Sequence, residues 1–178
     1  KLTLSDIEVG AAVVTQLGYR ISLNSYEPGA RLTKAISEMP NPKDKRELKS
    51  FLASCNVVRN HVDNYNSLTA ELSPLVLKTA VWEWKTHHQT AFDKLKMILL
   101  HPNVLVPFNQ SLETRVITDF NGFANPEGII KRRPAIGASL WQRHDKCWKP
   151  VGYASRFLSV AEQNLVTKEA AFSSSIGE

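Results

Sequence analysis

The chain has 178 residues, 43% of them hydrophobic, with 22 Lys or Arg against 17 Asp or Glu for a net charge of +5. This length allows one ordinary hydrophobic core or two small ones. Two cysteines exclude a disulfide-rich secreted scaffold and suit a reduced compartment, so we expect an intracellular protein, in the cytoplasm or nucleus. No apolar run reaches the ~18 residues of a membrane span, so no membrane partner is expected.

The positive charge is concentrated in two blocks. Residues 30–61 hold seven Lys or Arg against three Asp or Glu, and residues 131–156 hold seven against one. Their net charges of +4 and +6 leave −5 for the rest of a chain whose total is +5. Such blocks attract polyanions, although a solvated face explains them equally well before any further observation.

Helical patterns dominate the first hundred residues. Residues 30–39 carry apolar side chains at helical spacing, and prolines end the helix that they predict. Asp44 followed by Glu47 indicates a capping box at the start of a second helix. The apolar stripe that follows predicts one buried face, made of Leu48, Phe51, Leu52, Cys55, Val58 and Val62. Further helices are predicted over residues 68–77 and 86–100.

After Pro102 the apolar period changes from helical to alternating. Short strands separated by turn residues are predicted at four places, Val104–Phe108, Arg115–Phe120, Ala138–Arg143 and Val151–Arg156. A last helix is predicted over residues 161–172. The fold class is therefore α+β, with helices first and a β-rich part after them.

Two segments far apart in the chain carry a resemblance to a known family. One is Arg46–Leu52, followed by Asn56 and Arg59, and the other is Pro150–Asn164, which contains Tyr-Ala-Ser-Arg. Other matching segments occur in the same order, namely Leu17–Ser22, Trp84–Lys96, Pro102–Leu105, Thr118-Asp119 and Gly137–Leu140. In this series the chain resembles the Pol polyprotein of gypsy-type LTR retrotransposons, where the reverse transcriptase thumb and connection pass into ribonuclease H.

The resemblance implies three parts. Residues 1–29 match the end of the reverse transcriptase palm, and residues 30–101 match a helical thumb and connection. Residues 102–178 match a partial RNase H-like domain, with an incomplete mixed β-sheet, a truncated helix and an insertion near residues 122–136. These departures fit a diverged or decaying copy, and a domesticated copy would show the same marks.

The resemblance also implies a catalytic chemistry. Family ribonuclease H cleaves the RNA strand of an RNA–DNA hybrid with two Mg²⁺ ions held by four carboxylates. Asp119 matches the first carboxylate and Glu169 the second, and the other two are expected beyond residue 178. Without the family, Asp119 reads equally well as a turn aspartate. For Glu169, a solvated helix glutamate outweighs a metal ligand even within the family. We therefore expect weak or absent Mg²⁺ binding.

Polymerase activity needs paired aspartates, and no Asp-Asp pair occurs in the sequence. The family is an RNA-directed DNA polymerase and a hybrid ribonuclease, but this chain alone is expected to be inactive. Nucleic-acid binding remains, because the family's thumb helix packs on the primer–template duplex. The residues predicted to contact phosphates are Lys45, Arg46, Lys49, Arg59 and Arg156.

The expected partners are an RNA–DNA hybrid or duplex nucleic acid, together with the missing polymerase and RNase H segments of a longer Pol chain. The alternative is a domesticated or decayed non-enzymatic protein-interaction module. Affinity that falls steeply with salt favours the first reading, whereas salt-insensitive binding to a protein favours the second.

Overall fold

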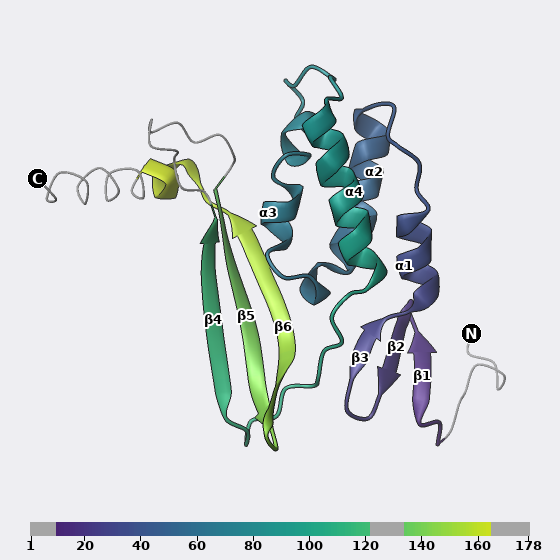
Figure 1. Ribbon diagram of the computed structural model, residues 1–178, viewed down its shortest axis with the longest axis vertical. Coiled ribbons are helices and arrows are strands. Elements are labelled where there is room, and N and C mark those ends of the chain that lie inside the picture. Colours follow the sequence, from purple (N-terminus) through teal and green to yellow (C-terminus); the bar gives the residue numbers. More distant parts are fainter. Residues whose placement is uncertain (1–9, 122–133, 165–178) are drawn as a thin grey trace, which may run out of the picture.

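The computed structural model describes residues 10–121 and 134–164. Figure 1 shows a group of helices with a small sheet below them on one side and a longer sheet beside them on the other. In chain order the elements are β1 (Val13–Gln16), β2 (Tyr19–Ser22), β3 (Tyr26–Pro28), α1 (Ala30–Ser37), α2 (Lys45–Val57), η2 (Arg59–His61), α3 (Tyr65–Thr69), η3 (Ser73–Val76), α4 (Thr86–Leu100), β4 (Thr114–Asn121), β5 (Ala135–His144) and β6 (Cys147–Phe157).

The first sheet is antiparallel, in the order β1-β2-β3. Leu17 and Gly18 both have positive φ and form the turn between β1 and β2, a conformation that glycine adopts at no steric cost. The matching segment Leu17–Ser22 is therefore a tight turn followed by β2. The sequence analysis did not predict β1 or β3, which are three or four residues long and depend on pairing with β2.

One hydrophobic core fills the helical part. The predicted stripe on α2 is confirmed, and the rings of Phe51 and Phe92 pack with their centroids 4.4 Å apart. The buried cluster comprises Ile36, Leu48, Phe51, Cys55, Val58, Val62, Tyr65, Leu72, Leu75, Phe92, Leu95 and Leu99. All of these residues belong to the part of the chain that runs from α1 through α4. The helical part therefore forms its hydrophobic core from its own residues.

The helix predicted over residues 68–77 is wrong. The helix α3 ends at Thr69, and the 3₁₀ turn η3 begins at Ser73, with Pro74 at its start. Proline lacks a backbone N–H and disfavours helical geometry in the residue before it. The apolar spacing across residues 68–77 therefore reflects two short elements that share one buried side.

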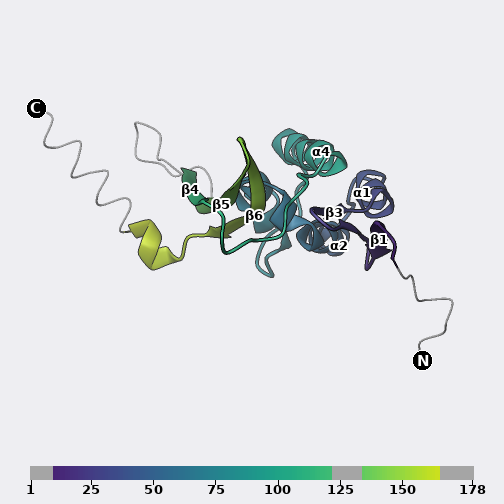
Figure 2. The same ribbon diagram turned by 90° about the horizontal axis from the view of Figure 1, so that it is seen from below.

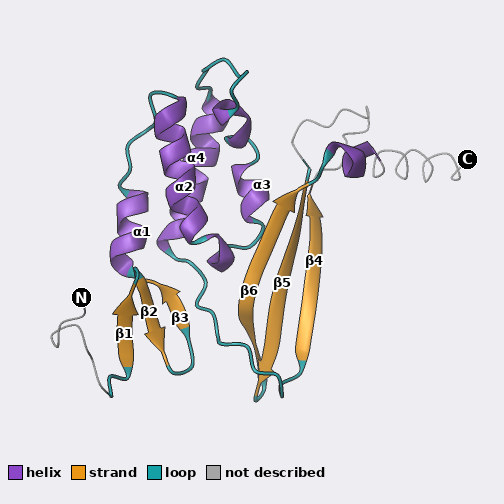
Figure 3. Cartoon of the chain, turned by 180° about the vertical axis from the view of Figure 1, so that it is seen from behind, coloured by secondary structure: helices purple, strands orange, loops and turns teal. Residues whose placement is uncertain are grey.

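The strand predicted over Val104–Phe108 is also wrong. Only Leu105 pairs, in an isolated bridge with Tyr26 whose two N–H···O distances are 2.9 and 3.0 Å. The N–H of Val106 donates to the carbonyl of Pro150 at 2.9 Å. This segment therefore connects β3 with β6, and Figure 3 shows it running between the two sheets.

The second sheet is antiparallel, in the order β4-β5-β6, and it confirms the three remaining predicted strands. Figures 1 and 2 place β6 on the side of the helices and β4 on the far side. Along β6 the side chains of Tyr153 and Ser155 are buried, whereas those of Ala154 and Arg156 are exposed. One face of the sheet is therefore turned toward the helical part.

The α+β class is confirmed, and the described strands of the second sheet are all antiparallel. The last predicted helix is present over residues 160–164, and the rest of it lies outside the described residues, as does nearly all of the insertion near 122–136. The boundaries 1–29, 30–101 and 102–178 stay predictions. Among the described helices, none is both long and apolar enough to cross a membrane.

Candidate nucleic-acid interface and carboxylate site

The first turns of α2 hold most of the predicted phosphate contacts. The carboxylate of Asp44 accepts from the N–H of Glu47 at 2.8 Å, and the Glu47 carboxylate accepts from the N–H of Lys43 at 2.7 Å. This capping fixes where the helix begins. Cations in a first turn face the positive end of the helix dipole, so Lys45 and Arg46 add nothing to helix stability through that dipole.

The structure separates these cations into two kinds. The ammonium group of Lys45 donates to carbonyl oxygens of the loop at residues 77–80, including that of Leu77 at 3.1 Å, and so ties this loop to α2. The side chains of Arg46 and Lys49 are exposed. Within the part of the chain that the structure describes, neither forms a hydrogen bond or an ion pair.

Lys49 stands at the edge of a groove of about 320 Å³. The lining of the groove mixes polar side chains, among them Asn56, Asn66 and Ser73, with apolar side chains of α2 and η3 and with Phe157 at the end of β6. In protein complexes with nucleic acids, phosphates and sugars are contacted by amide, hydroxyl and cationic side chains. Because the helical part and the second sheet both line the groove, its shape depends on how the two are docked.

Arg59 lies at the seam between the helical part and the second sheet. Its guanidinium donates to the carbonyl oxygen of Ser155 at 2.8 Å and to the side-chain oxygen of Asn56 at 3.5 Å. The side chain is half-buried. Arg59 therefore joins the two segments that carried the family resemblance.

Arg156 forms a two-point ion pair with Glu162, at 2.6 and 2.8 Å. This hydrogen bonding, together with donors from Ser159, lowers the pKa of Glu162 to about 2, and it also raises the pKa of Arg156. The pair is exposed and neutralises itself. Arg156 consequently offers a phosphate less unpaired charge than Arg46 or Lys49.

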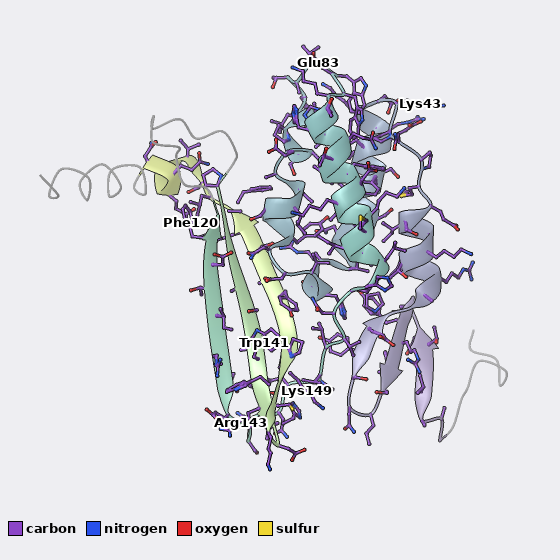
Figure 4. All side chains as sticks on the ribbon, viewed as in Figure 1. Lys43, Glu83, Phe120, Trp141, Arg143 and Lys149 are labelled. Carbon is purple, nitrogen blue, oxygen red and sulfur yellow. The ribbon has the colours of Figure 1, made fainter. Side chains whose placement is uncertain are left out.

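Asp119 lies on β4, where its Oδ2 atom accepts from the side-chain amide of Asn64 at 2.9 Å. Asp119 and Arg156 both border a hollow of about 520 Å³, but the strand register puts Asp119 in one row with Ser155 and Arg156 in the next row, whose side chains lie on the opposite face of the sheet. Asp119 is not among the residues that line the groove beside Lys49. In Figure 4, Phe120 beside Asp119 and Lys43 before α2 lie on opposite sides of the helices.

The described residues around Asp119 do not by themselves form a two-ion magnesium site. Mg²⁺ requires several oxygen ligands in near-octahedral geometry. Within residues 10–121 and 134–164 no group of three or more His, Cys, Asp or Glu is placed to hold a metal ion. The Asn64 amide already occupies one oxygen of Asp119, and Glu169 lies outside the described residues.

Sequence reasoning missed the partners of these residues. Asn64 has φ 49° and ψ 37°, a left-handed conformation that no spacing announces. Gly137, inside β5, was the available signal, because a glycine within a strand marks a close approach of another group. His61 was missed as well. Buried in the core, it shares a hydrogen bond of 2.8 Å between Nδ1 and the carbonyl of Asn103.

Comparison with known proteins agrees with this geometry. Residues 84–174, just over half of the chain, match the family model described as the RNase H-like domain found in reverse transcriptase. The Transposon Tf2-3 and Tf2-4 polyproteins of Schizosaccharomyces pombe (strain 972 / ATCC 24843) are each 31% identical over 149 residues. These matches cover 83% of this chain and 10% of each polyprotein, so the chain spans a small part of its relatives.

Solved structures show the same fold. The foamy viral protease-reverse transcriptase in complex with an RNA/DNA hybrid has a TM-score of 0.61 at 23% identity, covering 93% of this chain and 22% of that one. The same protein in complex with dsDNA has a TM-score of 0.63 at 22% identity, covering 93% and 34%. The expected resemblance to a retrotransposon Pol polyprotein is confirmed, and the chain belongs to the family of reverse-transcriptase RNase H-like domains.

Proposed function

We propose that this chain binds duplex nucleic acid, preferably an RNA–DNA hybrid, through the exposed cations of α2 and the groove beside them. The observation that carries the proposal is the pair Arg46 and Lys49. Both are exposed and, among the described residues, unpaired. Arg46 lies in the first turn of α2, where a cation is electrostatically unfavourable, and Lys49 lies in the next turn. These cations do not stabilise α2 and are available to bind a polyanionic partner.

The groove defines how a duplex backbone would lie. Asn56, Asn66 and Ser73 line the groove beside Lys49. Each already makes one hydrogen bond within the protein, and the remaining capacity of their amide and hydroxyl groups suits a phosphate–sugar backbone rather than base edges. Foamy viral reverse transcriptase of the same fold is solved with an RNA/DNA hybrid and with dsDNA, which supports the class of partner. Lys45, Arg59 and Arg156 are secondary, because each is committed to a contact within the protein.

The proposal assigns no polymerisation or hybrid cleavage to this chain by itself. Asp119 supplies one carboxylate, and Mg²⁺ chemistry at such a site would need further oxygen ligands, of which Glu169 is the proposed second. Other segments of a longer intracellular Pol chain are the proposed source of the remaining groups.

The test compares two double variants of equal net charge. Arg46→Gln with Lys49→Gln removes the proposed contacts, whereas Lys34→Gln with Lys94→Gln removes two cations from α1 and α4. Fluorescence anisotropy of a labelled RNA–DNA hybrid is measured from 50 to 200 mM salt. Each lost phosphate contact lowers the slope of log affinity against log salt by about 0.9. We expect the first variant to lose about two in slope and the control to keep the wild-type slope.

Equal slopes for both double variants would contradict the proposal, because nonspecific net charge would then explain the binding. The second candidate, a protein-interaction module, is favoured by the exposed apolar side chains of β4, where Val116 is 63% exposed. Salt-insensitive binding to a protein, with no affinity for the hybrid, would support that function instead.

A further inference from the structure

A row of three residues crosses the second sheet where the helical part docks. The strand register pairs Asp119 with Gly137 and Gly137 with Ser155. Three hydrogen-bonding side chains from the corner between η2 and α3 end on this row, and they are Arg59, Asn64 and Asn66. None of the three residues of this row belongs to the apolar cluster of the helical part, so polar groups make this portion of the contact.

Asn64 makes the contact to Asp119 possible. It stands just before α3 in a left-handed conformation, with φ 49°, which asparagine tolerates better than most residues. Its Nδ2 atom donates to Oδ2 of Asp119 at 2.9 Å. A Cβ atom at Gly137 would collide with the Oδ1 atom of Asn64 and lie 2.9 Å from its Cγ atom. Glycine at residue 137 is therefore required for the Asn64 side chain to reach across β5.

Ser155 forms the other half of the contact. Its hydroxyl accepts from the backbone N–H of Asn66 at 2.9 Å and donates to the side-chain oxygen of Asn66 at 2.8 Å. Its carbonyl accepts from Arg59 at 2.8 Å, and the residue itself is buried. The N–H of Asn66 belongs to the first turn of α3, where a helix offers no acceptor, so the sheet supplies the missing one.

We propose that Asp119 serves as the sheet-side acceptor of a polar latch, formed with Asn64 over Gly137 and completed by Ser155 with Asn66 and Arg59. The latch holds the second sheet against α3 and gives Asp119 a role separate from metal ligation. The role requires an oxygen at residue 119 that accepts from Asn64, and it does not require a negative charge. An ion ligand would require both.

The backbone N–H of Asn66 reports directly on the latch, because its acceptor lies on the other side of the seam. Its hydrogen exchange is measured by NMR in the free protein. Asn64→Gly keeps the left-handed backbone and removes the amide, and Gly137→Ala displaces the amide from the sheet side. We expect each to accelerate exchange at Asn66 about tenfold, since losing one hydrogen bond of ordinary strength shifts an opening equilibrium by about that factor. Asp119→Ala should do the same.

Two controls separate the latch from other causes. Gly152→Ala changes a glycine of the same sheet whose added Cβ would meet nothing within 4 Å, and it should leave the exchange at Asn66 unchanged. Asp119→Asn keeps an oxygen acceptor, so its exchange should stay near wild type, whereas a purely ionic role predicts that it behaves like Asp119→Ala. Slow exchange at buried Leu95 of α4 verifies that each variant is folded.

The proposal is overturned if Asn64→Gly and Gly137→Ala leave the exchange at Asn66 at the wild-type rate in folded protein. It is also overturned if Asp119→Asn opens the contact as fully as Asp119→Ala. Because nucleic acid is absent from this measurement, its result does not depend on whether the proposed duplex binding is correct.

Discussion

The helical part and the second sheet are held by different kinds of contact. The helical part encloses a continuous apolar cluster that runs from Ile36 to Leu99. The second sheet contributes nothing to that cluster, and on its outer strand Val116 and Ile117 are 63% and 46% exposed. Its contacts with the helices include the hydrogen bonds around Ser155, and Tyr153 on the same face of β6 is buried as well. Apolar burial therefore dominates the helical part, whereas directional polar contacts contribute to the position of the second sheet.

The largest difference between the regions should appear when an apolar side chain is removed. Phe92 is fully buried against Phe51, so Phe92→Ala should lower the free energy of unfolding by about 3–5 kcal/mol. Val116→Ala in β4 should change it by less than about 0.5 kcal/mol. Urea denaturation followed by circular dichroism measures both. Similar losses for the two variants would mean that the sheet has an apolar core of its own.

A smaller effect is expected when the contact of Arg59 between the helical part and the second sheet is removed. Arg59→Ala removes a charged donor from the Ser155 carbonyl and should cost about 1.5 kcal/mol. Trp141 and Trp148 report on the sheet once Trp82 and Trp84 are replaced by Phe, and urea unfolding is followed by their fluorescence. Arg59→Lys is the matched control, because it keeps the charge without the guanidinium fork. A midpoint unchanged in Arg59→Ala would show that the sheet is placed by other contacts.

The smallest effect concerns His61, where the first sheet meets the helical core. Burial lowers the pKa of His61 below its ordinary value of 6.5, against opposing contributions from the carbonyl of Asn103 and from Glu27. A lowered pKa means that the folded state resists the proton, so the stability from this group is present above pH 6.5 and is lost as the pH falls below it.

The replacement His61→Asn keeps a donor toward Asn103 but cannot be protonated. We expect the free energy of unfolding to fall less between pH 7.5 and pH 5 in His61→Asn than in the wild type, as measured by urea titrations at each pH. Parallel pH profiles for the two proteins would show that His61 is not responsible. The comparison removes the contribution of the carboxylates, which titrate in both proteins.

Sequence patterns predicted the helical part better than the rest. The stripe on α2 and the helix over 86–100 were found because a 3.6-residue period records a buried face directly. The prediction of a helix over residues 68–77 failed because two short elements that share a buried side give the apolar spacing of a single helix. The prediction of a strand over Val104–Phe108 failed because the segment makes backbone hydrogen bonds to two different sheets, through Leu105 and Val106. Its alternating apolar pattern reflects these two contacts.

The candidate site was predicted in its residue types but not in its connections. Arg46 and Lys49 could be found as cations beside an apolar stripe. The sequence equally favoured Lys45 and Arg59, which the structure ties to the carbonyls of a loop and of Ser155. The local sequence does not distinguish a lysine side chain that is exposed to solvent from one that donates to a backbone carbonyl more than thirty residues away in the chain.

The sequence by itself determined the family, the α+β class, the helices α1, α2 and α4, the three strands of the second sheet, and the set of cations and carboxylates from which a site can be built. These depend on local periodicity, capping and motif order, which are written along the chain. Only the tertiary structure decided that Asn64 covers Gly137 and reaches Asp119, and that Arg59 meets Ser155. The reason is physical, since such contacts depend on a left-handed backbone at one residue and on the register of three strands, and both are fixed only when the parts of the chain pack together.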